Sequence, residues 1–531
     1  MTWAINPALV LGLDPKQFTL VERNRSSEGV DQSGETSAKK TKITLSPEAR
    51  LGLIRLLEGT QGCPGFFESI AGLSRKILVS RHVIRELLAF MKRKRWLKSR
   101  GENQYEYTEK FFQLFATAKR GKEFRYMEKV IPAFLDEQKR LHAMQNVSRS
   151  LGASLPNASQ YLLLILLYTA DLRGVVSGIG RTVLFNMAGM SKSRTHSQLA
   201  NLRKLEVIIR LVEGETLFPP IGKMASVYVL NLWHPSFGLH ELKLNRITVT
   251  NKYIPPYNAN PFWMRLAFAR DRWCDAQRIL KDKEARKKSY EREIGSLPET
   301  LASDTEKSGS PTNTSIELDI ADVQGILRNK LTAKRVQFEI EEVAAYLIGK
   351  EHRAIAELNG KMLTFRNIEY SRSARFWIPF PIGIERKEVF KIAAKRVISA
   401  LFSSLEKDAE SLSFLVATNK SDDLFLPLTN EKSGIQNLIR LLSLEAIYLA
   451  MEFEGAVRKS FGVGGRSVLF LPLEKKETAL IRTIWIVGPG VAGRSVEMER
   501  SVENGSEWRS SCQSLKEQGA PTASLSRKNK S

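Results

Sequence analysis

The sequence predicts a mixed fold, with two mainly α-helical modules in the N-terminal half followed by an α+β domain. Three observations lead to this fold class. The chain has 531 residues, more than a single hydrophobic core organises. Apolar residues make up 43% of the chain, which is enough to build buried cores. A pattern of three helices and two strands occurs twice in the N-terminal half.

Changes in composition divide the chain. Residues 24–42 and 295–314 have few large apolar side chains, which is typical of disorder. The polar run after Arg494 is expected to be disordered as well. The predicted segments are a disordered lead-in (1–43), a first module (44–118), a basic helical linker (119–150), a second module (151–245), a basic helical segment (246–294), a disordered linker (295–315), an α+β domain of unknown role (316–493) and a disordered tail (494–531).

The first module is expected to begin with three helices. Ser46 is expected to cap the first of them, with Pro47 at its first position. The second is expected over 69–78, and Ser80 is expected to cap the third. The apolar residues of the third helix recur at helical spacing and predict its buried side: Val83, Ile84, Leu87, Leu88 and Met91.

The other side of this third helix is small and basic. It is formed by Arg81, His82, Arg85, Ala89 and Lys92. Such a surface suits the major groove of DNA, where arginine pairs with guanine through two hydrogen bonds. Two strands are expected over 95–99 and 104–108, around a turn at 100–103. Lys98 and Arg100 make this hairpin basic.

The same order of elements returns about 110 residues later and defines the second module. Helices are expected over 161–169 and 182–188, and a tight turn at 189–191 leads into a third helix that ends near Leu205. Polar and basic residues are predicted on the outward face of that helix: Arg194, Ser197, Asn201 and Lys204. Strands are expected over 207–212 and 226–232, with Lys223 near the tip of the loop between them.

Both modules resemble winged-helix (helix-turn-helix) domains, which occur in bacterial regulators and in tandem in plasmid replication initiators. The resemblance covers 44–115 and 155–235. The turn before the third helix usually holds a small residue, which Gly189 provides, but Leu78 stands there in the first module. In this family the third helix enters the major groove and the wing contacts the backbone or the minor groove. The resemblance therefore implies a DNA-binding site made of Arg81, His82, Arg85, Lys92, Lys98, Arg100, Lys192, Arg194, Ser197, Asn201, Lys204 and Lys223.

The charge balance favours a polyanionic partner. Lys and Arg number 81 against 57 Asp and Glu, which gives a formal net charge of +24. Double-stranded DNA is the leading candidate, and an anionic membrane surface is the second. No apolar run approaches the length of about 20 residues that a membrane span needs. The start of the chain does not have the pattern of a signal peptide. We therefore expect a cytoplasmic, nucleoid-associated protein that is not bound to a membrane.

Motifs for catalysis, cofactors and metals are weak. The three cysteines lie far apart without a CxxC pair, which disfavours a zinc knuckle and a disulfide framework. Residues 488–493 fit the glycine pattern of a dinucleotide-binding loop, but a polar tail follows where a helix and a strand are needed. No two of the six histidines lie within three residues of each other, which disfavours the metal site of DNA-nicking enzymes. We expect no catalytic, cofactor-binding or metal-binding residues and no enzymatic activity.

Three hypotheses about function follow. The first is a DNA-binding protein that acts as a transcriptional regulator or as a replication or partition factor of a mobile element. The second is an interaction or scaffold protein that uses its winged helices for protein contacts, and the third is an enzyme in the C-terminal domain. We expect that domain to serve oligomerisation or partner binding. The charged run at 281–292 is either a solvated helix face or a phosphate-contacting helix. Residues 151–240 are expected to fold on their own.

Overall fold

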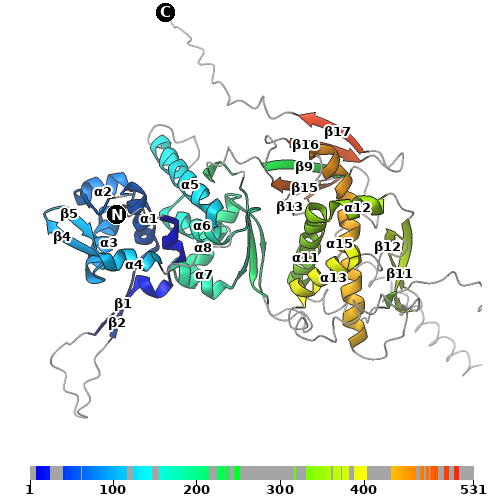
Figure 1. Cartoon of the computed structure of the whole chain (residues 1–531), viewed down its shortest axis with the longest axis horizontal. Helices are drawn as coiled ribbons and strands as arrows, with labels where there is room; N and C mark the ends of the chain where they lie inside the picture. The colour runs from blue at the N-terminus through cyan, green and yellow to red at the C-terminus, as the bar shows by residue number, and fades with distance from the viewer. Residues whose placement is uncertain are drawn as a thin grey trace, which may run out of the picture. The chain divides into compact units, whose positions relative to one another are not determined.

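A computed structural model gives the arrangement of helices and strands (Figure 1). It describes residues 7–23, 40–60, 63–116, 124–145, 155–214, 224–232, 234–237, 244–251, 316–317, 330–359, 363–371, 374–381, 388–402, 432–461, 467–471, 474–476, 479–487, 495–500 and 508–513. Two compact units emerge: unit 1 contains Met1–Gly214 and Ala225–Leu242, and unit 2 contains Glu215–Met224 and Lys243–Ser531. Each unit combines helices with small sheets, so the chain is a mixed α/β protein.

The first module contains the three predicted helices. Its elements are α1 (Pro47–Gly59), β3 (Gly65–Phe67), α2 (Ile70–Lys76), α3 (Arg81–Arg93), β4 (Leu97–Gly101) and β5 (Gln104–Tyr107). Each helix starts where a serine hydroxyl accepts a hydrogen bond from a backbone N–H three residues later, and these serines are Ser46, Ser69 and Ser80. Such caps satisfy donors that the first turn of a helix leaves unpaired.

The second module repeats this order. Its elements are α6 (Asn157–Thr169), β6 (Val175–Ile179), α7 (Arg181–Ala188), α8 (Lys192–Lys204), β7 (Ile208–Val212) and β8 (Ser226–Leu230). The sheet orders are β3-β5-β4 in the first module and β6-β8-β7 in the second. Helices α3 and α8 begin at residues 81 and 192, and strands β4 and β7 at 97 and 208, so both pairs are offset by 111 residues. The two modules therefore share one topology.

Strands β3 and β6 were not predicted from the sequence. β3 has only three residues, which is too short for an alternating pattern of apolar and polar side chains. β6 carries a bulge between Val176 and Ile179, and Gly178 within it has φ of +78°. Each of these strands pairs with the last strand of its module and completes a three-stranded sheet.

The turns before α3 and α8 have the same backbone conformation. Gly189 has φ of +64°, and Leu78, at the equivalent position 111 residues earlier, has φ of +52°. The left-handed conformation costs a non-glycine residue about 1–2 kcal/mol, which explains why a small residue is usual there. The first module therefore keeps the turn and accepts strain at Leu78.

Helices α1 and α6 form the centre of unit 1 and pack against each other. Every residue from Ala158 to Tyr168 is buried, and the central leucines are 0% exposed. A helix that is apolar on all sides has to be covered on all sides. Neighbouring elements of unit 1 provide further cover for α6, including α5 (Phe124–Gln145) and the 3-10 helix η1 (Pro7–Gly12).

The remaining elements of unit 1 surround these two modules. They are the 3-10 helices η2 (Pro15–Phe18) and η3 (Pro235–Phe237), the strands β1 (Thr19–Arg23) and β2 (Lys40–Thr44), and α4 (Glu109–Ala116). The 3-10 helices η1 and η2, strand β1 and most of β2 fall within the lead-in 1–43, so the expectation of disorder is wrong for these residues. Helix α5 lies in the predicted basic helical linker.

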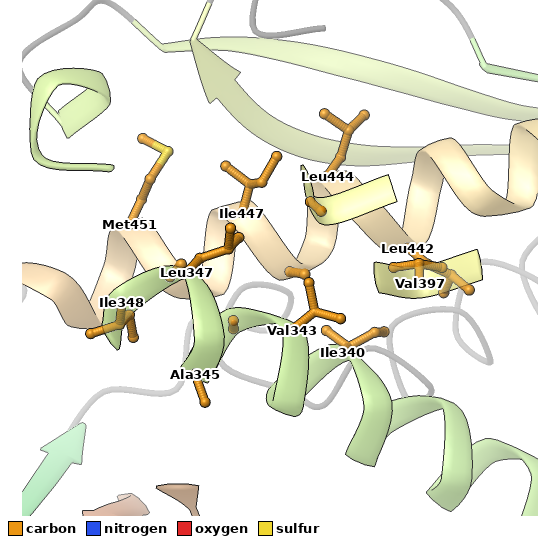
Figure 2. Packing of buried hydrophobic residues seen from close by; sticks show 14 of the residues in the cluster. Ile340, Val343, Ala345, Leu347, Ile348, Val397, Leu442, Leu444, Ile447 and Met451 are labelled. Atoms are coloured by element: carbon orange, nitrogen blue, oxygen red, sulfur yellow. The ribbon is translucent and has the colours of Figure 1, made fainter. Parts of the chain in front are cut away.

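Unit 2 is built around three helices: α11 (Lys330–Lys350), α13 (Glu388–Leu401) and α15 (Lys432–Phe461). Figure 2 shows how α11 and α15 face each other through side chains such as Val343, Leu347 and Ile447. The shorter helix α12 (His352–Asn359) packs on α15. The apolar residues of α15 are buried in this core, among them Leu438, Leu441, Leu442, Leu444 and Ile447.

Within the described residues, two sheets belong to unit 2. One has the order β10-β11-β12, and the other has the order β13-β15-β9-β16-β17, with β14 also paired to β15. The strands are β9 (Leu244–Asn251), β10 (Ile316–Glu317), β11 (Leu363–Ser371), β12 (Ala374–Pro381), β13 (Ser467–Phe470), β14 (Glu474–Lys476), β15 (Ala479–Val487), β16 (Ser495–Arg500) and β17 (Trp508–Gln513).

Strands β16 and β17 correct the expectation of a wholly disordered tail over 494–531. They pair with each other, and β16 also pairs with β9. The polar composition of these strands concealed them, because one-sided or edge strands need few apolar residues. The predicted basic helical segment (246–294) begins with residues of strand β9 in place of a helix. Its remainder from residue 252, the linker at 295–315 and the glycine motif at 488–493 lie outside the described residues.

Candidate nucleic-acid interface

Helix α3 separates its apolar and basic sides as predicted. Ile84, Leu87 and Met91 are buried against the module core. The five residues of the opposite side, Arg81, His82, Arg85, Ala89 and Lys92, are all exposed. The Ser80 cap fixes the start of the helix, so Arg81 and His82 are presented in its first turn. A basic, solvent-facing helix surface of this kind is able to approach a polyanion.

The β4-β5 hairpin extends this basic surface. Lys98 and Arg100 are exposed on β4. Arg100 lies 2.6 Å from the carboxylate of Glu106 on β5, and this hydrogen bond raises the pKa of Arg100. Lys92 of α3 lies with its Nζ 5.1 Å from the centroid of the Tyr105 ring. Lys92 of α3 therefore contacts the hairpin at Tyr105, and Arg100 is partly neutralised by Glu106.

The predicted residues of α8 are also exposed. Lys192, Arg194, Ser197, Asn201 and Lys204 all face solvent, whereas Thr195, Leu199 and Leu202 are buried. This sequence-predicted face is rotated by one residue relative to the face predicted on α3. With the offset of 111 residues, the equivalents of His82, Arg85, Ala89 and Lys92 are Ser193, His196, Ala200 and Arg203, all of them exposed. One residue corresponds to a rotation of about 100°.

The offset identifies residues that the sequence reasoning missed on α8. Arg203 and Ser193 lie on the exposed side that corresponds to the basic side of α3. The ring of His196 is on the same side and contacts Phe185 of α7, with the ring centroids 5.6 Å apart. Aligning the two serine caps, Ser80 and Ser191, would have revealed this correspondence from the sequence, because the cap sets the helical phase.

Arg194 does not stand alone on the surface of α8. Its guanidinium forms an ion pair with Glu48, which lies in the first turn of α1 in the first module. The sequence predicted an outward Arg194 available to DNA, and the structure adds a carboxylate partner. Nothing in the local sequence of either helix signals this contact, because the two residues are 146 positions apart.

Two buried arginines of α1 hold the backbone that leads into the third helices. Arg50 is 1% exposed, and its Nη1–H donates to the carbonyl oxygen of Met187 at 2.8 Å. Arg55 donates from Nη1 to the carbonyl oxygens of Ile77 and Leu78, at 3.0 and 3.2 Å. These carbonyls belong to the left-handed residue Leu78, to its neighbour Ile77, and to Met187, two residues before the left-handed Gly189.

Arg55 also joins α1 to α6. Its Nη2–H donates to Oε1 of Gln160 at 2.6 Å, and Gln160 in turn donates to the carbonyl oxygen of Leu155. Burial lowers the pKa of Arg55 to about 10, although the nearby Glu58 carboxylate acts in the opposite direction. Multiple hydrogen bonds are the usual compensation for burying a guanidinium. The buried arginines thus connect the two modules as well as their turns.

Other candidate sites give no chemistry within the described parts of the chain. Lys223, predicted near the tip of the second wing, lies outside the described residues. Among the residues that the structure describes, no cluster of three His, Cys, Asp or Glu side chains is arranged to hold a metal ion. No helix in the described ranges is long and apolar enough to cross a membrane.

The exposed surface of unit 1 therefore contains two basic or polar third helices and one basic hairpin, all supported by the α1-α6 centre. Comparisons with protein-family models, with curated proteins and with solved structures found no match to this chain.

Proposed function

We propose that the chain is a DNA-binding protein that contacts duplex DNA through two winged-helix modules in unit 1. The observation that carries this proposal is the repeated topology, in which a serine-capped third helix follows a left-handed turn and precedes a hairpin in both modules. In winged-helix proteins that bind DNA, this third helix lies in the major groove and the hairpin contacts the backbone.

The charge of the exposed surfaces supports the same proposal. Arg81, Arg85 and Lys92 on α3, and Lys192 and Lys204 on α8, are exposed cations of the two third helices. A net charge of +24 adds a long-range attraction for polyanions. We propose that Arg85 approaches a base edge and that Lys98 and Arg100 contact phosphates.

The biological role that fits this arrangement is a transcriptional regulator or a replication or partition factor of a mobile element, acting in the cytoplasm on the nucleoid. Unit 2 then serves oligomerisation or partner binding, and no catalytic step is assigned to the chain. A scaffold protein that uses its winged helices for protein contacts is the alternative hypothesis. The basic character of α3 favours DNA over an apolar protein surface.

A binding experiment with the full chain tests the proposal. Preferred duplexes are selected from a random pool, and affinities are measured for wild type, Arg85→Ala and Lys110→Ala. Lys110 is an exposed cation on α4 outside the proposed interface and serves as the control. We expect Arg85→Ala to lose about 1–3 kcal/mol on the preferred duplex and to relax selectivity at one base pair, with a much smaller effect of Lys110→Ala. Wild-type protein that binds no duplex at low salt would contradict the proposal and favour the scaffold hypothesis.

A further inference from the structure

The first turn of α1, in the first module, reaches the first turn of α8, in the second. Glu48 pairs there with Arg194. The Glu48 side chain is 23% exposed and that of Arg194 is 43% exposed, so the pair lies at the surface. Ion pairs at the surface contribute little to stability, with a median of about 0–1 kcal/mol. The main consequence of this pair is that it restrains the orientation of a long and flexible cation.

Arg50, two residues after Glu48, contacts the turn immediately before α8. It donates to the carbonyl oxygen of Met187, and its guanidinium lies against Gly189 so closely that a Cβ atom there would be 2.5 Å from Cζ. The side chain is held from behind by its own hydrogen bond to Leu45 and by the ring of Phe18, 4.6 Å from Cζ. The backbone from which α8 starts is therefore fixed by a residue of the first module.

We propose that Glu48 and Arg50 are positioning residues for DNA recognition by the second module, an inference that rests on the proposed function. Arg50 sets the position of the α7-α8 turn, and Glu48 orients the guanidinium of Arg194. A guanidinium has five N–H donors, and a carboxylate on one side leaves the others free for a base edge or a phosphate. A side chain that is already ordered loses less entropy on binding. The first module thus determines the base selectivity of the second.

Selectivity measurements on the full chain test this inference. Wild type, Arg194→Ala, Glu48→Gln and Glu109→Gln are compared on the preferred duplex, on its single base-pair variants and on random duplex. Glu109 is an exposed residue of α4, so Glu109→Gln makes the same change in charge outside α1 and α8 and is the matched control. Arg194→Ala identifies the base pairs whose preference depends on Arg194.

We expect Glu48→Gln to reduce selectivity at those base pairs about 3- to 10-fold, within the range of couplings between contacting residues. Its affinity for random duplex should match that of Glu109→Gln, because both lose one negative charge. Adding Glu48→Gln to Arg194→Ala should cause no further loss of selectivity. Arg50→Lys, which keeps the charge but lacks the planar fork, should lower selectivity at the base pairs that α8 contacts and leave those contacted by α3 unchanged.

Thermal unfolding of each variant is measured in parallel, so that a loss of fold is distinguished from a loss of selectivity. The inference would be overturned if wild type binds the preferred duplex and the folded variants Glu48→Gln and Arg50→Lys keep its selectivity. That result would leave the proposed function intact. The inference would also be overturned by an equal loss on every duplex in Glu48→Gln. A wild-type chain that binds no duplex would overturn the proposed function and, with it, this inference.

Discussion

His234 connects the end of α8 to the segment that follows β8. Its Nδ1 accepts a hydrogen bond from the backbone N–H of Ser236 at 3.2 Å, which requires an unprotonated nitrogen. Burial lowers the pKa of His234, while a hydrogen bond with the Leu205 backbone and the charge of Glu206 partly oppose this shift. The ring is therefore neutral in the folded protein at neutral pH.

A pH-dependent stability follows from this lowered pKa. The unfolded chain binds the proton more tightly than the folded protein, so the free energy of unfolding should decrease as the pH falls below about 6.5 and through the lower folded-state pKa. In His234→Gln this decrease in the free energy of unfolding should be absent. Urea unfolding of both proteins between neutral and mildly acidic pH measures the difference. Parallel pH profiles of wild type and variant would contradict the assignment.

We expect substitutions at the two left-handed positions to change the free energy of unfolding by different amounts. Gly189→Ala adds about 1–2 kcal/mol of backbone strain and places Cβ against Arg50, so we expect a destabilisation of more than 2 kcal/mol. Leu78→Gly removes similar strain but increases the entropy of the unfolded chain by about 0.5–1 kcal/mol, so its net effect should stay within about 1 kcal/mol. Denaturant unfolding measures both. Similar losses in the free energy of unfolding for the two variants would contradict this account of the two turns.

At the scale of elements, sequence patterns located the third helices well. Serine caps and apolar residues at helical spacing are local signals: α3 starts directly after the expected cap Ser80, and α8 starts after the expected turn at 189–191 and ends next to Leu205. The short strands β3 and β6 escaped because their pairing is established by the last strand of each module, far along the chain. The pair Glu48 and Arg194 escaped for the same reason. Local patterns encode the elements, whereas contacts between modules depend on long-range packing.

Helices α1 and α6 revise the expectation that residues 151–240 fold alone. Tyr161 and the leucines after it are buried, and Gln160 binds Arg55 of the other module. Removing α1 would expose apolar surface, and each Å² exposed costs about 25 cal/mol of free energy. It would also leave buried polar groups without partners. We expect the 151–240 fragment to lack a cooperative unfolding transition and the fragment 1–242 to show one. Calorimetry of both fragments decides the matter, and a cooperative transition of 151–240 alone would contradict the account.

At the scale of the whole molecule, both modules belong to one compact unit. The third helices α3 and α8 are therefore connected through packed helices and buried arginines, in place of a flexible tether. If both contact DNA, their phosphate contacts should act together on one duplex. Each contact releases condensed counterions, so the dependence of affinity on salt reports how many contacts are made.

The salt dependence of DNA binding by the full chain tests the central claim most directly. For about 6–10 phosphate contacts, the affinity should fall about 10³- to 10⁵-fold between 50 and 200 mM salt, and log K should decrease with log salt by about 0.9 per contact. Neutralising Arg81 and Lys98 in the first module, or Lys192 and Lys204 in the second, should make the slope shallower in each case by about 0.9 per contact removed. A chain that binds no duplex at 50 mM salt, or whose slope stays the same when either set of cations is removed, would contradict DNA binding through both modules.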